Sequence, residues 1–204
     1  MTTDAQRQAA RVARTIAAVA AVGVLCLVVF TLVGGPFGFL NDLANATVGL
    51  LSAALAWLLQ RGRANAWSLV AALIGGVVMV FGSVLVMADV TGWYLAGLVS
   101  AVGSALIGLW VLAVNGMQPV AGELSSGLRR LGLIAGAVML TGLLALPGVV
   151  GGVDDASAAS WVVSAGLVSW LGTYVLYPVW CWLVSRQLSA QNVNTPAMTD
   201  EPET

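Results

Sequence analysis

The chain has 204 residues, of which 59% are hydrophobic and only 8% are charged, whereas roughly 25% of the residues of a soluble domain are charged. This composition argues against an ordinary soluble domain, and the formal net charge of −1 gives no reason to expect binding to nucleic acid. Histidine and lysine are absent, and the two cysteines, Cys26 and Cys181, each stand alone in an apolar run. No residues are therefore spaced like the ligands of a metal ion.

Six uncharged apolar runs follow one another along the chain, separated by short polar segments. Most have the roughly 20 residues needed to cross a bilayer, and a charge at the centre of one would cost about 2.5–3.5 kcal/mol. We therefore predict an all-α polytopic membrane protein with six transmembrane helices. The predicted spans are residues 15–33, 43–59, 67–88, 92–114, 131–150 and 160–185, between a cytoplasmic N-terminal segment (1–14) and a disordered cytoplasmic tail (186–204). Pro147 and Pro178 are expected to kink or end the fifth and sixth helices locally.

The distribution of charge predicts an orientation for these spans. All eight arginines fall on one side of the membrane in a six-span arrangement: Arg7, Arg11, Arg14, Arg61, Arg63, Arg129, Arg130 and Arg186. The other side holds Asp42, Asp89, Asp154 and Asp155. Since arginine and lysine accumulate in cytoplasmic loops, we expect both termini in the cytoplasm and the protein in the cell inner (plasma) membrane.

An internal repeat is visible in the second half of the chain. The segment LIGGVVMVFG (Leu73–Gly82) recurs as LIAGAVMLTG (Leu133–Gly142), and GLVSAVGS (Gly97–Ser104) recurs as GLVSWLGT (Gly166–Thr173). Two echoes in the same order indicate a duplicated pair of helices. We predict three consecutive helical hairpins, the last two forming a tandem repeat. Gly49–Ser52 (GLLS) resembles GLVS, the start of the second repeated segment. A threefold repeat that includes the first hairpin is therefore the alternative.

Small residues recur along the predicted spans at helical spacing. The fourth span has Ala96, Ser100, Ser104 and Gly108, the fifth Gly132 and Gly136, and the sixth Ala165, Ser169 and Thr173. In lipid, helices associate through close van der Waals contact and hydrogen bonds, and small residues allow their backbones to approach. These stripes therefore predict close helix–helix packing.

The first group of candidate site residues lies before the second span. Asn41, Asp42 and Asn45 belong to the most polar stretch beside any span, and Asp42, Asp89 and Asp155 each precede an even-numbered helix. Two interpretations remain open. The aspartates cap helix N-termini and the asparagines make interhelical hydrogen bonds, or these residues line an outer vestibule ringed by carboxylates that attract cations.

The second group lies on the sixth span, where Trp170, Tyr174, Tyr177 and Cys181 recur at spacings of four, three and four. One interpretation is aromatic packing inside the bundle, where the tyrosine hydroxyls need partners. The other is one wall of a pocket for a lipid, a quinone or another flat apolar molecule, with Pro178 loosening the helix beside it.

The sequence offers little for catalysis. It has no histidine or lysine as a base, no carboxylate within the predicted spans and no cysteine beside a base. We therefore expect a protein that is not an enzyme and holds no cofactor or metal. It would act in the lipid bilayer as an accessory subunit or a module that binds lipid or an apolar ligand, as a homo-oligomer or in a larger membrane complex. The alternative is a small facilitator or channel-like transporter with an acidic outer mouth.

Overall fold

The computed structural model describes residues 3–60, 66–117, 124–155, 157 and 160–193. Within these residues the fold is all-helical and contains no strand. The α-helices are α1 (Thr3–Val33), α2 (Phe37–Gln60), α3 (Ala66–Met87), α4 (Trp93–Leu112), α5 (Ser126–Leu140), α6 (Leu146–Val150), α7 (Ser160–Leu171) and α8 (Tyr177–Val193). A π-helical turn, η1 (Ala113–Met117), extends α4. The 3-10 turn η2 (Thr141–Ala145) joins α5 to α6, and a second π-helical turn, η3 (Gly172–Leu176), joins α7 to α8.

In this described part of the chain, six helical stretches are long and apolar enough to cross a membrane. The predicted all-α architecture with six such helices is therefore confirmed. Large apolar side chains cover the outside of the bundle: Leu25, Val77 and Ile134 are each more than half exposed, while Asn45 and Ser104 are buried inside. Because an apolar exterior of this extent suits lipid rather than water, the structure has the features of a polytopic membrane protein.

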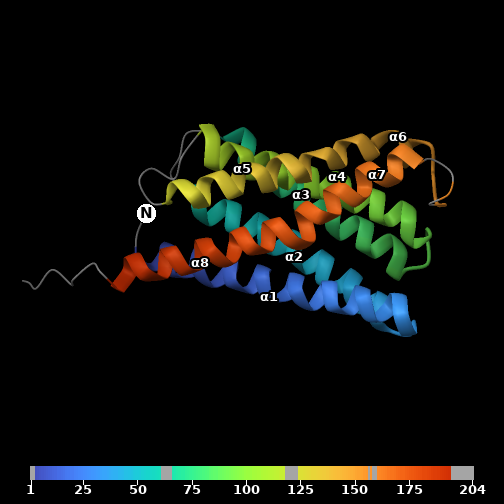
Figure 1. Cartoon of the computed structure of the whole chain (residues 1–204), viewed down its shortest axis with the longest axis horizontal. Coiled ribbons are helices and arrows are strands. Elements are labelled where there is room, and N and C mark those ends of the chain that lie inside the picture. Colours follow the sequence, from blue (N-terminus) through green and yellow to red (C-terminus); the bar gives the residue numbers. More distant parts are fainter. Residues whose placement is uncertain (1–2, 61–65, 118–123, 156, 158–159, 194–204) are drawn as a thin grey trace, which may run out of the picture.

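The helices form a closed bundle in which neighbours in sequence are also neighbours in space. Packing runs from α1 through α2, α3 and α4 to α5, and α8 then lies against α1. Figure 1 shows the bundle lengthwise, with the start of α1 and the end of α8 at the left, and the α1–α2 and α3–α4 turns at the right. We call the end with the α1–α2 and α3–α4 turns the aspartate end, because Asp42, Asp89, Asp154 and Asp155 lie there. The opposite end, near the two chain termini, is the arginine end.

At the arginine end, α1 and α8 extend beyond the predicted spans. The 31 residues of α1 correspond to about 46 Å, more than the roughly 30 Å of a hydrocarbon layer. Ala9, Ala13 and Leu188 are buried where the two helices pack together. The prediction that residues 186–204 form a disordered tail is therefore wrong for residues 186–193, which continue α8. Packing against α1 stabilises a helix that its polar sequence alone did not indicate.

Glycines bring the helix backbones into direct contact, and two of them, Gly108 and Gly136, belong to the small-residue stripes that predicted close packing. Three pairs of glycines face each other across neighbouring helices. A Cβ atom built at one glycine of each pair would lie 2.6–2.7 Å from the backbone carbonyl oxygen of the other. The pairs join α3 to α2, α3 to α4, and α5 to α4: Gly76 with Gly49, Gly75 with Gly103, and Gly136 with Gly108. No larger residue fits at these positions without moving the helices apart.

Regular α-helix is interrupted just before both prolines on which the sequence analysis placed kinks. Pro147 follows η2 and lies in the first turn of α6, and Pro178 follows η3 in the first turn of α8. Because proline has no N–H, Pro178 cannot donate to the carbonyl of Tyr174, four residues earlier. The two halves of this last span have different neighbours. α8 packs along α1, whereas α7 packs against α4, α5 and η2.

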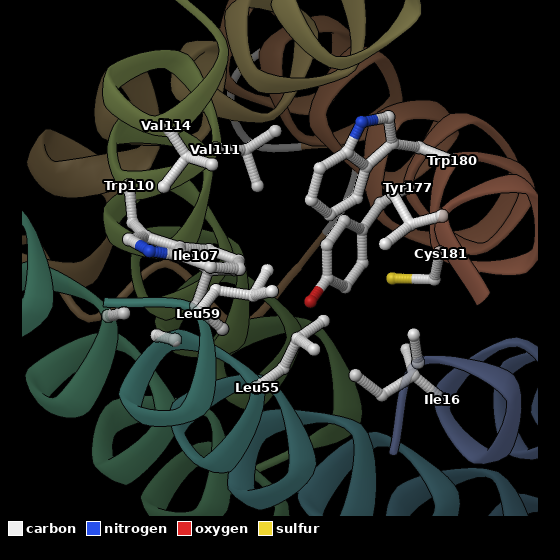
Figure 2. Close-up of a cluster of buried hydrophobic side chains, with 14 of the residues drawn as sticks. Ile16, Leu55, Leu59, Ile107, Trp110, Val111, Val114, Tyr177, Trp180 and Cys181 are labelled. Atoms are coloured by element: carbon white, nitrogen blue, oxygen red, sulfur yellow. The ribbon is translucent and has the colours of Figure 1, made fainter. Parts of the chain in front are cut away.

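The half of the bundle nearer the arginine end is filled by large apolar side chains. Leu55, Ile107, Trp110 and Trp180 are completely buried, and Figure 2 shows them converging from α2, α4 and α8. The rings of Trp110 and Trp180 meet edge to face with centroids 6.1 Å apart, a favourable aromatic geometry. This apolar plug separates the arginine end from the polar interior at the other end.

Candidate functional site

A cavity of about 330 Å³ opens into the bundle at the aspartate end. Residues of α1, α2, α3, α4, α7 and η3 line it. The lining extends from Trp93 at the mouth, which is 62% exposed, to Ser104 and Thr173, which are buried inside the bundle. The cavity therefore combines an opening beside the membrane surface with a floor within the membrane-spanning part of the helices.

Five of the seven residues in the two candidate groups from the sequence line this one cavity. Asn41, Asp42 and Asn45 come from α2, whereas Trp170 and Tyr174 come from α7 and η3. The sequence analysis treated them as two separate groups, a vestibule and an aromatic wall. The bundle joins the groups because α7 packs against α4 and η3 contacts α1, so that both border the same cavity as α2.

The other two, Tyr177 and Cys181, are not among the residues that line the cavity, and Tyr177 shows why. Its side chain is completely buried, and its hydroxyl donates to Ser52 Oγ at 2.8 Å. Its ring stacks on Trp180 with centroids 6.0 Å apart, and Figure 2 shows it in the apolar plug together with Cys181. Tyr174 and Tyr177 are three residues apart, but Tyr177 packs in the core, as the first interpretation of the aromatic face expected.

Asn41 is the central polar group on the α2 wall. Its side chain is only 8% exposed and interacts with both the Asp42 carboxylate and the Tyr174 hydroxyl. Its Oδ1 atom has no hydrogen-bond partner among the described residues and lies beside Gly23 of α1. A buried amide oxygen without a partner is costly, so the position of Asn41 between α2 and α1 leaves one hydrogen bond unmade.

The other polar side chains deeper in the cavity are mostly paired with one another. Asn45 Nδ2 donates to Ser83 Oγ at 3.5 Å. Ser104 and Thr173 share a hydrogen bond between their hydroxyls. Ser169 lies outside the lining, four residues before Thr173, and donates to the carbonyl of Met139 at 3.1 Å. These interactions bind α2 to α3 and α4 to η3, and α7 to α5. The floor of the cavity is thus polar, and the hydroxyls of Ser83, Ser104 and Thr173 already take part in hydrogen bonds.

Aromatic rings supply much of the remaining lining, and sequence reasoning missed several of them. Phe30, Phe39 and Trp93 join Trp170 and Tyr174 around the cavity. A usable signal was present on α2, where Phe39 and Asp42 are three residues apart and so share a helix face. For Phe30 and Trp93 no such signal exists, because their position depends on how α1 and α4 are placed around α2.

The predicted N-capping role of the aspartates is wrong for two of them. Asp42 lies inside α2, which begins at Phe37 rather than near residue 43. Asp89 adopts a left-handed conformation, with φ of 55°, after the end of α3. Only Asp42 lines the cavity, so Asp89 and Asp155 do not form a ring of carboxylates around it.

A carboxylate distant in sequence caps α4 instead. Asp154 accepts hydrogen bonds from the backbone N–H groups of Gly92 at 2.6 Å and Leu95 at 3.0 Å. Asp155 accepts from the backbone N–H and hydroxyl of Ser157 at 2.8 and 2.7 Å. These bonds, the backbone one first, hold the pKa of Asp155 below its usual value. The α6–α7 connection is therefore tied to the start of α4, beside the cavity mouth.

The lining is suited to binding. Among the described residues that line it, Asp42 is the only charged one, and none is a cysteine, arginine or glutamate. Among the described residues no three metal-ligating side chains gather in one place. Comparison with protein families, with curated proteins and with solved structures gives no match. The fold and the cavity therefore define only a class, an α-helical protein with six helices able to cross a membrane and a cavity at the aspartate end.

Proposed function

We propose that the protein is a non-catalytic membrane module that holds an amphiphilic molecule, such as a lipid or a quinone-like compound, in the cavity at its aspartate end. In this role it acts by itself, as a homo-oligomer or as an accessory subunit of a larger membrane complex. The observation that carries the proposal is the lining, which combines apolar and aromatic walls with polar groups of α2 and a few hydroxyls at the floor. Sites for small molecules have this mixture of apolar walls and a few convergent polar groups.

The arrangement of the last span supports access from the lipid. Leu27 and Phe30 of α1 line one side of the cavity, and Trp170 and Tyr174 line another. α8 packs along α1, but α7 makes at most marginal contact with it in the described structure. The last span thus packs along α1 through α8 near the arginine end and separates from α1 through α7 toward the aspartate end. In this proposal an apolar molecule from the bilayer reaches the cavity between α1 and α7.

The alternative function, a facilitator or channel-like transporter, rests on the outer position of Asp42 and on the hydroxyl-rich floor. Two features favour binding over transport. The floor hydroxyls of Ser104 and Thr173 bond to each other, and the apolar plug around Trp110 and Trp180 occupies the next part of the bundle. Uptake of a small polar solute by vesicles containing the purified protein, at a rate above that of empty vesicles, would favour the facilitator.

Filling the cavity tests the binding module. Val86 lines the cavity from α3, whereas Val84, two residues earlier, is 45% exposed on the outside of the bundle. Lipids and quinones extracted from purified protein are identified by mass spectrometry. We expect a defined molecule to co-purify with the wild type and with Val84→Trp, and to be lost from Val86→Trp. The same content in both variants, or no bound molecule in the wild type, would overturn the proposal.

We also propose that the arginine end faces the cytoplasm in the inner membrane, with both termini on that side. The asymmetric charge supports this orientation. Arg129, Arg130 and Arg186 lie on the described part of the arginine end, whereas Arg61 and Arg63 lie outside the described residues. Reporter domains fused after Gln60 and inserted after Asp155 should report opposite compartments, and the same compartment for both would contradict the proposed orientation.

Finally, we propose that three helical hairpins build the bundle and that the last two arose by duplication. The contacts between α3 and α4 support this, because they recur between the second copies of the same segments. Equivalent pairs are Gly82 with Ser100 and Met79 with Gly103 in the first copy, and Gly142 with Ser169 and Met139 with Gly172 in the second. We propose that an approximate two-fold axis relates the two copies. Equivalent residues contact each other where they lie on such an axis, and the equivalent residues Ser104 and Thr173 share a hydrogen bond.

The proposed axis makes the surroundings of Ser104 and Thr173 interchangeable. Exchanging them in the double variant Ser104→Thr/Thr173→Ser should restore most of the thermal stability that either single substitution loses. Double-variant losses equal to the sum of the two single losses would indicate unrelated surroundings and count against duplication.

A further inference from the structure

The cavity has an unbalanced electrostatic character. Asp42 is its only charged lining residue, and no arginine among the described residues pairs with it or contributes to its electrostatic surroundings. The described arginines lie mainly toward the arginine end, beyond the apolar plug. An anionic ligand, such as one carrying a phosphate, would therefore meet a negative charge with no donor cation to offset it.

Aromatic rings line the same cavity as this carboxylate. Phe39 lies three residues before Asp42 on the same face of α2. Phe30, Trp93, Trp170 and Tyr174 line the cavity from α1, α4, α7 and η3. The face of an aromatic ring attracts a cation, most strongly where water is excluded, and quaternary ammonium groups are recognised by such rings.

From this juxtaposition we propose that the cavity recognises an organic cation, an ammonium group carrying an apolar arm, with Asp42 as its counter-ion. This inference rests on the proposed binding function and specifies its ligand. The aromatic rings of Phe39 and Trp93 contact the cationic head near the mouth. The apolar arm lies along Leu27 and Val86.

The same chemistry occurs in a free lipophilic amine and in a lipid with an ammonium headgroup. In both cases the positive head lies near the aspartate end, where water is close, and the apolar part lies toward α1 and the bilayer. The access between α1 and α7 proposed above suits either source, because the arm can remain in the lipid while the head reaches Asp42.

The decisive experiment uses two probes of the same shape, benzyltrimethylammonium and its uncharged carbon analogue neopentylbenzene. Binding to the purified full-length protein in dodecyl maltoside, which carries no ammonium group, is followed by tryptophan fluorescence. We expect the wild type to bind the cation about tenfold more tightly or better. Asp42→Asn, which keeps the shape of the side chain, should lose most of this preference, and Phe39→Leu should reduce it without weakening the neutral probe.

The outcomes separate this inference from the binding function. Equal affinity for both probes in the wild type, or an unchanged preference in Asp42→Asn, would overturn the cation inference while leaving a cavity that binds apolar molecules. If neither probe binds to Val86→Trp while both bind to Val84→Trp, the probes occupy the cavity. Binding of both probes to Val86→Trp would overturn the inference. Competition by phosphatidylcholine but not by phosphatidylglycerol would identify a lipid headgroup as the source, and no competition by either would identify a free amine.

Discussion

Replacing Asp154 with alanine should destabilise the bundle although the residue is exposed and lies in a connection. Its carboxylate accepts from the N–H groups of Gly92 and Leu95 at 2.6 and 3.0 Å, which would otherwise lack partners at the start of α4. Gly92 itself provides no side-chain cap. Loss of an N-cap costs about 0.5–2 kcal/mol, and the favourable interaction of the carboxylate with the helix dipole adds about 0.3–1 kcal/mol.

We therefore expect Asp154→Ala to lose about 1–2 kcal/mol. In a chain of this size that loss lowers the midpoint of thermal unfolding by about 2–8 °C. The assay is the unfolding of purified protein in detergent, followed by tryptophan fluorescence. Asp155→Ala is the matched control, because Asp155 bonds only to Ser157 in its own turn. Equal midpoints for the two variants would refute the assigned role of Asp154.

Three further predictions concern the core and the connections. Tyr177→Phe should cost about 1 kcal/mol, and Ser52→Ala about 1–3 kcal/mol because it leaves the tyrosine hydroxyl unpaired; the double variant should recover part of the loss in detergent unfolding. Gly75→Ala places a Cβ 2.6 Å from a carbonyl oxygen of α4, so it should lower the unfolding midpoint, whereas Gly127→Ala, with open space around it, should not. The lowered pKa of Asp155 contributes stability above its ordinary value of 3.8, and this contribution is lost as the pH falls through the lowered value. A plot of the midpoint against pH should therefore be flatter for Asp155→Asn in that acidic range, and an identical slope would contradict the assignment.

The sequence predicted the membrane-spanning helices well because each signal was contained within one segment. An uncharged run such as residues 67–88 needs no information from elsewhere, and α3 occupies Ala66–Met87. Boundaries that depend on packing were less predictable. α8 continues to Val193 because its last turns lie against α1, and α2 begins at Phe37, so Asp42 lies inside a helix rather than before one.

The candidate site was recognised only as separate fragments. Asn41 and Asp42 stood out by polarity beside a span, and Trp170 and Tyr174 by their spacing on one face. That both groups line one cavity depends on the course of the last span, and this is interrupted at η3 ahead of Pro178. Asp154 was predicted to lie at the outer surface, but its bond to Gly92 joins residues 62 apart.

The sequence by itself determined the solvent and the class of fold. Six stretches without charge require lipid around them, and a chain in lipid must satisfy its backbone hydrogen bonds within each helix. Only the tertiary structure decided which tyrosine lines the cavity and which fills the plug. Tyr174 and Tyr177 have the same polarity and lie on the same span, so only the neighbouring helices distinguish the cavity from the core. Those neighbours are set by contacts such as Gly49 with Gly76, where two small residues let the backbones meet.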